Sequence, residues 1–265
     1  MTGSPVADLH VHTTASDGVL SVEEIPAAAR DASLHTVALT DHDRFNPSLK
    51  DPVTTVDGIR VIRGIELKVS CPNGTTIDLL GYATTETPAL ASLIADLQTN
   101  RIERAREMIA QLERALDISI DCPMHEGIGR PHIAQAVADH SAVSLTKDDV
   151  FDEYIGDGRP CHVQREIPTL AEGARILTDA CQLVSVAHPL RYDDLEAALA
   201  AAVDVGAIER WYPYDRPVDP SPIDRAIADH SLIPTGGSDA HGPQLGQCGL
   251  DEPACQRFLT ALGSA

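Results

Sequence analysis

The chain has 265 residues, 43% of them hydrophobic, so it is long enough to bury a full core and too apolar to be intrinsically disordered. Its formal net charge of −20 excludes nucleic-acid binding that depends on a basic surface. The apolar stretches are too short or too interrupted to span a bilayer, and no leader pattern precedes Asp8. We therefore expect a cytoplasmic protein with no membrane partner.

Two further features of the composition concern the environment of the protein. Lysine is almost absent, occurring only at Lys50, Lys68 and Lys147, and Asp outnumbers Glu. Short, strongly hydrated carboxylates keep a protein soluble in concentrated salt, so we interpret the charge as halophilic adaptation. The six cysteines are scattered without a CxxC pair, which predicts reduced, packed thiols rather than disulfides or a zinc finger.

Apolar runs typical of β-strands recur along the chain, and most of them end at a polar or ionisable cluster. Helical patterns lie between several of them. This alternation is typical of a parallel β/α barrel, whose chemistry lies at the carboxyl ends of the strands. The predicted strands are Val6–Val11, Thr36–Leu39, Arg60–Ile65, Thr76–Leu80, Leu183–Ala187, Ala207–Trp211 and Leu232–Pro234, and the helices between them are Pro26–Ala32, Leu170–Ala180, Asp194–Val203 and Pro222–Asp229.

One region breaks this alternation. Pro88–Leu116 is a long helical pattern, and Pro131–Tyr154 suggests short helices without an obvious strand. We therefore predict that residues 88–159 form a helical insertion in a catalytic barrel made of residues 1–87 and 160–265.

Two histidines close the first predicted strand. Because side chains alternate in a strand, His10 and His12 point to the same side and offer two imidazoles to one metal ion. Asp17 follows in a turn with Gly18, which permits a tight bend that brings the carboxylate back over the same place. An HxH pair alone is weak evidence, because many such pairs are incidental surface residues.

The second predicted strand ends at Asp41, His42 and Asp43. Such groups are costly to bury without partners, and a shared cation is a usual partner. A helix N-cap made by either aspartate is the competing interpretation, but it leaves His42 unexplained. Glu66 ends another predicted strand and is able to bridge two ions. Asp78, inside an apolar run, is either a ligand or a paired buried acid.

Two motifs follow in the second half of the chain. His188 comes directly after a predicted strand, and Pro189 restricts the backbone behind it. Asp239 and His241 form a DxH pair between glycines that let the backbone approach closely. Each motif alone could be a satisfied core histidine or a cap. Together, at successive strand ends, they favour one shared metal-binding face.

These ordered motifs resemble those of the PHP (polymerase and histidinol phosphatase) superfamily, and the similarity spans nearly the whole chain. The insertion and a Gly-Arg-Pro-His-Ile-Ala segment resemble the branch of stand-alone nucleotide phosphatases and RNA-trimming exonucleases. The resemblance implies an α/β fold, namely a distorted (β/α)7 barrel with a helical insertion, and a phosphoesterase activity. It is carried by His10-Val-His12-Thr13, Ser16-Asp17-Gly18, Thr40-Asp41-His42, Gly64-Ile65-Glu66, Gly129-Arg130-Pro131-His132-Ile133-Ala134, Ala187-His188-Pro189 and Ser238-Asp239-Ala240-His241.

The resemblance also implies two or three divalent metal ions. The chain departs from many relatives at Asp78, where histidine is common, and an oxygen ligand shifts the preference from Zn²⁺ toward Mn²⁺ or Mg²⁺. We therefore expect Mn²⁺, with Zn²⁺, Fe²⁺ or Mg²⁺ as alternatives. The implied ligand sets are His10, His12, Glu66 and Asp239 for one ion, Glu66, Asp78 and His188 for a second, and Asp17, His42 and His241 for a third.

The implied chemistry needs no side-chain nucleophile, because the ions polarise the phosphoryl oxygens, activate a water molecule and hold the attacking and leaving oxygens in line. Asp17, His42 and His132 are the candidate catalytic residues. His132 and Arg130 are also candidates to bind substrate phosphate, because they lie in the segment that resembles the family.

Arg101 and Arg104 are further candidates for phosphate binding. They lie three residues apart on one predicted helix face, and guanidinium groups suit phosphate oxygens. Ion pairing with Glu103 or Glu107 on a solvated helix explains them equally well. We expect a small phosphorylated substrate, such as a 3′,5′-bisphosphonucleotide or a short RNA, and no extended nucleic-acid surface.

Four other functions compete with this interpretation. A histidinol-phosphate phosphatase would use the same ions, but the insertion argues against it. A metal-dependent amidohydrolase also uses HxH on a barrel, but it usually lacks the later motifs. A non-catalytic metal-binding module should have lost ligands, and few aromatic residues disfavour a nucleic-acid-binding protein. The exact substrate, the native metal and the oligomeric state stay open.

Overall fold

The computed structural model describes residues 3–263. It divides the chain into two compact units, one made of the residues up to Ser92 together with those from Ile167 onward, and the other of Leu93–Glu166. We call them the sheet unit and the insertion unit. The predicted insertion, residues 88–159, overlaps most of the second unit, whose limits lie a few residues later along the chain.

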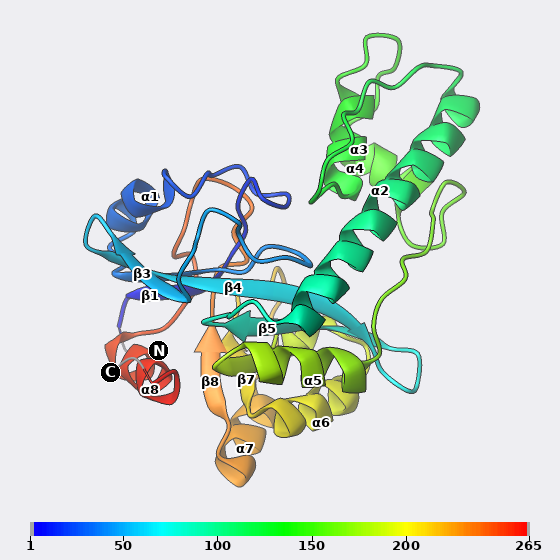
Figure 1. Cartoon of the computed structure of the whole chain (residues 1–265). Coiled ribbons are helices and arrows are strands. Elements are labelled where there is room, and N and C mark those ends of the chain that lie inside the picture. Colours follow the sequence, from blue (N-terminus) through cyan, green and yellow to red (C-terminus); the bar gives the residue numbers. More distant parts are fainter. Residues whose placement is uncertain (1–2, 264–265) are drawn as a thin grey trace. The chain divides into compact units, whose positions relative to one another are not determined.

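The sheet unit is a mixed α/β structure built on an 8-stranded sheet (Figure 1). The strands follow the order β1-β2-β4-β5-β6-β7-β8, and β3 pairs with β4 off this path. All the predicted strands are present, and β3 was not predicted. The strands are β1 (Ala7–Val11), β2 (Thr36–Leu39), β3 (Val53–Val56), β4 (Ile59–Ser70), β5 (Thr76–Tyr82), β6 (Leu183–Val186), β7 (Ala207–Trp211) and β8 (Ile233–Gly236).

The direction of β5 differs from that of its neighbours. Strands β1, β2 and β4 are parallel, as are β6, β7 and β8, whereas β5 is antiparallel to both β4 and β6. Every other strand of the path therefore ends at the edge where β5 begins. This places Asp78, near the start of β5, at the same edge as residues that follow the ends of the other strands.

Strand β4 also differs from the prediction. The sequence analysis placed Glu66 at the end of a strand, but β4 continues to Ser70 because it pairs with β5 along Gly64–Ser70. Glu66 therefore lies inside the strand, opposite Leu80, and forms an isolated parallel bridge with His42 beyond the end of β2. Its backbone is held on both sides, which favours a fixed position for its side chain.

The predicted helices of the sheet unit are present, and α8 is an additional one. Helix α6 is capped at both ends, because Asp194 accepts a hydrogen bond from the Ala197 N–H at 3.0 Å and Gly206 ends the helix with a positive φ of 91°. The core under α8 contains Tyr82 and Phe258, whose rings meet edge to face at 5.2 Å. The helices are α1 (Ile25–Asp31), α5 (Leu170–Ala180), α6 (Leu195–Val205), α7 (Ser221–His230) and α8 (Glu252–Ala261).

The described elements of the insertion unit are helical. Its long helix α2 (Pro88–Leu116) starts in the sheet unit and is followed by α3 (Arg130–Ala138), α4 (Lys147–Val150) and a π-helical turn over Phe151–Ile155. Its own buried cluster includes Met108, Leu112, Ile133 and Val137. An independent core of this kind gives the unit its own packing.

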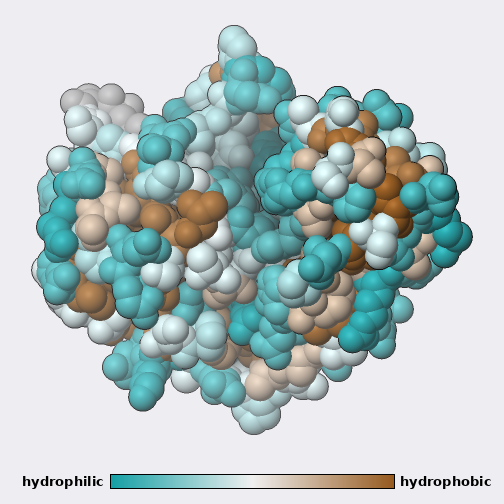
Figure 2. All heavy atoms as spheres, turned by 90° about the horizontal axis from the view of Figure 1, so that it is seen from above, coloured by the Kyte–Doolittle hydropathy of each residue, from teal (hydrophilic) through white to brown (hydrophobic). Residues whose placement is uncertain are grey.

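The surface and the thiols complete the description. Hydrophilic residues predominate on the face shown in Figure 2, and hydrophobic residues form separate groups on it. All six cysteines are free, which confirms the prediction of unpaired thiols. Within residues 3–263, no helix combines the length and the apolar character that a membrane crossing requires.

Candidate metal centre

Glu66 lies at the centre of a group of histidines from three other parts of the sheet. It is 2% exposed, and its carboxylate oxygens lie 2.7 Å from His42 Nδ1 and 3.2 Å from His188 Nε2. The Nε2 atoms of His10 and His12 are each 3.4 Å away. The structure therefore gathers ring nitrogens from the end of β1 and from the loops after β2 and β6 around one buried carboxylate.

Asp17 faces the outer side of this group. Its Oδ1 lies 3.4 Å from His241 Nε2, 3.8 Å from His42 Nε2 and 4.0 Å from His12 Nδ1. Burial alone would raise the pKa of Asp17, but His42 and then the hydrogen bond from His241 bring it far below its usual range. The carboxylate is therefore ionised and turned toward three imidazoles.

Asp239 occupies the opposite flank, after β8. Its Oδ1 is 3.1 Å from His12 Nε2 and 3.4 Å from His10 Nε2, while its Oδ2 accepts a hydrogen bond from the Tyr212 hydroxyl at 2.9 Å. Burial would raise the pKa of Asp239, but His10 above all holds it far below its usual range. Tyr212 thus orients a carboxylate that faces both histidines of the HxH motif.

The sequence left two interpretations of Asp78 open, a metal ligand or a paired buried acid, and its contacts fit both. Its Oδ2 lies 3.9 Å from His188 Nε2, and it belongs to a set with Glu66 and His188 whose ligand atoms are mutually within 4.8 Å. It is also paired with Lys68, its cross-strand neighbour, whose Nζ lies 2.7 Å from its carboxylate. The Lys68 ammonium group therefore already contacts the carboxylate that would bind an ion.

Removing the Lys68 ammonium is expected to strengthen ion binding at Glu66, Asp78 and His188. An ion that binds Asp78 must compete with a half-buried ion pair worth about 1 kcal/mol, so Lys68→Met should tighten Mn²⁺ binding at these three residues by about fivefold. Titration calorimetry with Mn²⁺ measures this change, and Lys147→Met, at an exposed lysine, is the matched control. Unchanged affinity in both variants would show that the pair does not compete with the ion.

Four sets of side chains in the described chain have ligand atoms that lie within 4.8 Å of one another. Several of these buried atoms make no hydrogen bond within residues 3–263. Unpaired buried polar atoms are costly, and imidazole and carboxylate groups together suit Mn²⁺, Zn²⁺ or Fe²⁺, so the donor set fits divalent ions. The ring nitrogens without a hydrogen bond are His10 Nε2, His12 Nδ1 and Nε2, and His188 Nδ1.

These sets contain the residues that the sequence analysis named. The sets differ from the implied division in two respects. His12 joins the group of Asp17, His42 and His241, and Asp239 is grouped with His10 and His188 rather than with His12 and Glu66. The rings of His12 and His241 stack at 4.1 Å, which explains why one imidazole lies within reach of two groups.

Opposite charges within the cluster shift the pKa values of its members. Burial would raise the pKa of Glu66, but His42 and His10 hold it well below its usual range. Burial would lower the pKa of His10, but Asp239 and then Glu209 bring it well above its usual value. Because a metal-bound imidazole must be deprotonated on the ligating nitrogen, ion binding at His10 has to displace a proton.

The N-cap interpretation of Asp41 and Asp43 is wrong, because neither residue starts a helix in the described chain. Asp41 is instead fully buried and accepts hydrogen bonds from the Thr13 N–H and hydroxyl, both at 2.8 Å, and from the Ser16 hydroxyl at 2.7 Å. It therefore fixes the turn that carries Asp17.

Sequence analysis missed Asp8 and Glu209, which are both fully buried. Asp8 accepts hydrogen bonds from the Ser238 hydroxyl at 2.5 Å and from the Gly246 N–H at 2.9 Å, and burial raises its pKa to about 6. The sequence offered one signal that could have found them, because each of the two is an acid inside an apolar strand pattern. Asp8 supports the loop that presents Asp239.

Two glycines permit the close packing of the centre. A Cβ at Gly237 would lie 2.4 Å from the backbone nitrogen of His10, and one at Gly18 would lie 2.2 Å from the His12 carbonyl oxygen. No side chain fits at such distances. The expectation that the glycines before Asp239 let the backbone approach closely is confirmed at Gly237.

Two arginines of α2 are buried within the insertion unit, so the solvated helix face considered above is wrong for them. Arg101 is 7% exposed and Arg104 is 9% exposed. Arg101 Nη1 donates to the Ile128 carbonyl at 3.1 Å, and Arg104 Nε donates to the Val163 carbonyl at 2.5 Å. These backbone contacts hold both guanidinium groups in fixed positions.

The arginines of the insertion unit form a local concentration of positive charge. Burial above all, followed by Arg130, Arg165 and Arg101, lowers the pKa of Arg104 to about 9. Arg130 Nη1 pairs with the exposed Asp157 at 2.7 Å. Like charges gathered in a chain of net charge −20 favour an anion as ligand.

His132 lies in the first turn of α3. Its Nδ1 accepts a hydrogen bond from the Gly129 N–H at 3.1 Å, and its ring packs edge to face against His125 at 5.1 Å. Because Nδ1 accepts, the neutral ring carries its proton on Nε2. In this tautomer, Nε2 is the ring nitrogen of His132 that donates a hydrogen bond.

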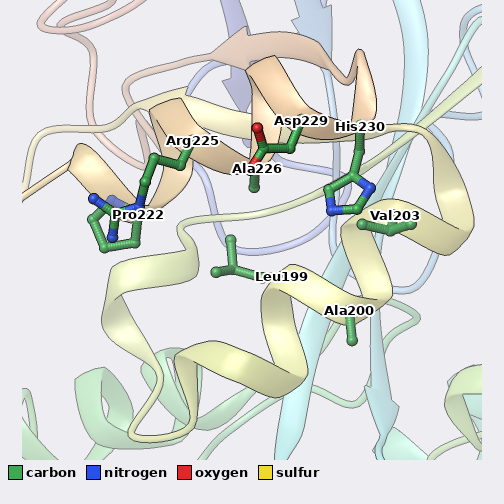
Figure 3. A pocket seen from close by; sticks show the side chains of 8 residues that line it. All are labelled: Leu199, Ala200, Val203, Pro222, Arg225, Ala226, Asp229 and His230. Carbon is green, nitrogen blue, oxygen red and sulfur yellow. The ribbon is translucent and has the colours of Figure 1, made fainter.

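A separate pocket of about 320 Å³ lies between α6 and α7 (Figure 3). Leu199 and Val203 of α6 face Pro222 and Ala226 of α7 there, with His230 at one end. None of its lining residues belongs to the groups described above, so this pocket has no part in the metal centre.

Comparison with known proteins is consistent with this arrangement. The family model described as PHP domain matches residues 8–188. A 3′,5′-nucleoside bisphosphate phosphatase of Chromobacterium violaceum is 32% identical over 90% of this chain and 88% of its own length. A 5′-3′ exoribonuclease of Haemophilus influenzae is 30% identical over 70% of this chain and 69% of its own.

A solved structure from Bifidobacterium adolescentis, described as a metal-dependent phosphoesterase, has a similar fold. It superimposes with a TM-score of 0.80 at 23% identity and covers 98% of each chain.

Proposed function

The chain belongs to the PHP domain family, and on that premise we propose that it is a metal-dependent phosphoesterase acting on phosphate esters of nucleotides or short oligonucleotides. Two relatives at 30% identity or more support this substrate class, because one is named a nucleoside bisphosphate phosphatase and the other an exoribonuclease. The 3′-phosphate of a 3′,5′-bisphosphonucleotide is the substrate that we favour. The distorted (β/α)7 barrel remains our interpretation of its sheet unit.

The observation that carries the proposal is the position of Glu66, buried among four imidazoles, of which those of His10, His12 and His188 have buried ring nitrogens that make no hydrogen bond within residues 3–263. Glu66 belongs to two of the candidate ligand sets, so its carboxylate would contribute to holding ions in both. Carboxylates at the other flanks extend the donor set, and the mixture of oxygen and nitrogen ligands favours Mn²⁺. The proposed ligands are His10, His12, Asp17, His42, Glu66, Asp78, His188, Asp239 and His241.

The ions, when bound, supply Lewis-acid stabilisation of the phosphoryl oxygens and lower the pKa of a water molecule. The protein holds the donors in place through its buried contacts. Asp17 and His42, 3.8 Å apart, are suited to orient the attacking water, because both are partly open to solvent at 10% and 28% side-chain exposure. His132 Nε2 is suited to bind a phosphate oxygen or to protonate the leaving oxygen.

Recognition of the substrate is assigned to the insertion unit. Arg101, Arg104 and Arg130, with His132, offer charged donors to a second phosphate, which a bisphosphonucleotide carries and a simple phosphate ester lacks. A histidinol-phosphate phosphatase needs no such arginines, and this observation favours the nucleotide substrate. A non-catalytic module is disfavoured because every proposed ligand position holds an imidazole or carboxylate.

Loss of the Arg130 guanidinium tests the substrate assignment. Arg130→Ala is expected to lower kcat/KM for a 3′,5′-bisphosphonucleotide about ten- to a hundredfold. This corresponds to the loss of one charged hydrogen bond, which contributes about 1.5–3 kcal/mol. Hydrolysis of p-nitrophenyl phosphate, which has one phosphate, should change much less. Steady-state kinetics with Mn²⁺ measures both.

Arg159→Ala is the control, because Arg159 is an exposed arginine of the same unit. Equal losses on both substrates in Arg130→Ala would contradict a role in holding a second phosphate. A wild-type protein that hydrolyses neither substrate, nor a 5′-phosphorylated oligonucleotide, would contradict the proposed function itself.

A further inference from the structure

Glu209 is a fully buried carboxylate in β7 that faces two of the proposed ligands. Its Oε1 lies 3.2 Å from His10 Nδ1, and its Oε2 accepts a hydrogen bond from the backbone N–H of His188 at 2.6 Å. His10 ends β1 and His188 follows β6, so one side chain contacts two segments far apart in the sequence.

The contact with Glu209 gives the two ring nitrogens of His10 different roles. Nδ1 faces Glu209, whereas Nε2 faces Glu66 and Asp239 at 3.4 Å each. An imidazole that donates Nδ1–H to a carboxylate keeps its Nε2 lone pair for a cation and cannot rotate away. Glu209 therefore selects the nitrogen through which His10 binds.

The contact between Glu209 and His188 constrains the backbone of His188. His188 has φ 27° and ψ 57°, a conformation that non-glycine residues rarely adopt and that surrounding contacts must maintain. The hydrogen bond from its N–H to Glu209 is one such contact, and in this conformation His188 Nε2 lies 3.2 Å from Glu66. The rings of His188 and His10 stack at 5.7 Å, so their positions are coupled.

We propose that Glu209 is a positioning residue of the metal centre, a carboxylate that fixes the ring of His10 and the backbone of His188 at the same time. The proposal rests on the assignment of these histidines as ligands in the proposed function. A carboxylate is required because both contacts are with N–H donors. An amide at this position has one acceptor oxygen, so its NH₂ group would face one of the two donors.

The test is metal binding by the full chain, stripped with a chelator and then titrated with Mn²⁺ and Co²⁺. Glu209→Gln is expected to bind the ion at His10 about 10–100-fold more weakly, the usual effect of removing a carboxylate behind a ligating histidine. The visible absorption of bound Co²⁺ should change as well, because the ligand geometry changes. A role limited to stability would leave the spectrum of the fully loaded variant identical to that of the wild type.

Glu252→Gln is the matched control, because Glu252 also lies beside a histidine, 3.0 Å from His35 Nε2, but on the surface. Wild-type affinities and spectrum in Glu209→Gln would overturn the inference alone. A wild-type chain that binds no divalent ion would instead overturn the proposed function, so the two failures are distinguishable.

A second measurement needs no variant and remains decisive if Glu209→Gln does not fold. In the Zn²⁺-loaded wild-type protein, nitrogen-15 NMR of the histidine rings should show His10 protonated at Nδ1 and bound through Nε2. Binding through Nδ1 would overturn the inference, because that nitrogen would then no longer donate to Glu209.

Discussion

Glu66→Gln is expected to lower kcat/KM for a nucleotide phosphate by more than about a thousandfold. The carboxylate lies within 3.4 Å of nitrogen atoms from His10, His12, His42 and His188. An amide carries no negative charge to offset adjacent cations. The stabilisation that ions give a phosphoryl transition state amounts to several kcal/mol, and each 1.36 kcal/mol corresponds to a tenfold change in rate.

The measurement combines steady-state kinetics with metal analysis of the purified variant. Glu66→Gln should retain fewer ions per chain than the wild type, and p-nitrophenyl phosphate should be lost as a substrate together with the nucleotide. Glu172→Gln, at an exposed acid of α5, is the control for a change of charge alone. A variant with full metal content and wild-type rates would show that Glu66 is not a ligand.

The second large effect is expected from removing both buried arginines of α2. Each guanidinium should contribute about 1.5–3 kcal/mol through charged hydrogen bonds to a phosphate, so Arg101→Ala with Arg104→Ala should lower nucleotide turnover by up to about ten-thousandfold. Because the two residues are neighbours, the double variant should differ from the sum of the single variants. p-Nitrophenyl phosphate should be affected far less.

Arg106→Ala is the control, since Arg106 is an exposed arginine of the same helix. Thermal unfolding of each variant separates lost recognition from lost packing, because Arg101 and Arg104 also hold the Ile128 and Val163 carbonyls. Equal losses of turnover on both substrates, with an unchanged melting temperature, would contradict a role of these arginines in recognising the nucleotide.

The sequence by itself determined the parts of the site that depend on local geometry. His10 and His12 share a face because side chains alternate in a strand. Arg101 and Arg104 share a helix face because of the helical repeat. The alternation of strands, clusters and helices likewise predicted the α/β class, since each signal spans a few neighbouring residues.

Only the tertiary structure decided the features that depend on strand pairing and on packing between distant segments. Nothing local to β5 indicates that it runs antiparallel to its neighbours, yet this direction brings Asp78 to the edge where the histidines lie. Glu209 is a lone acid in an apolar strand, and its role exists only because His10 and His188 lie on either side of it. The position of the buried Arg104 depends equally on a distant segment, because its guanidinium donates to the Val163 carbonyl. A sequence pattern reports which side of an element a residue occupies, whereas the neighbours on that side are set by how the whole chain packs.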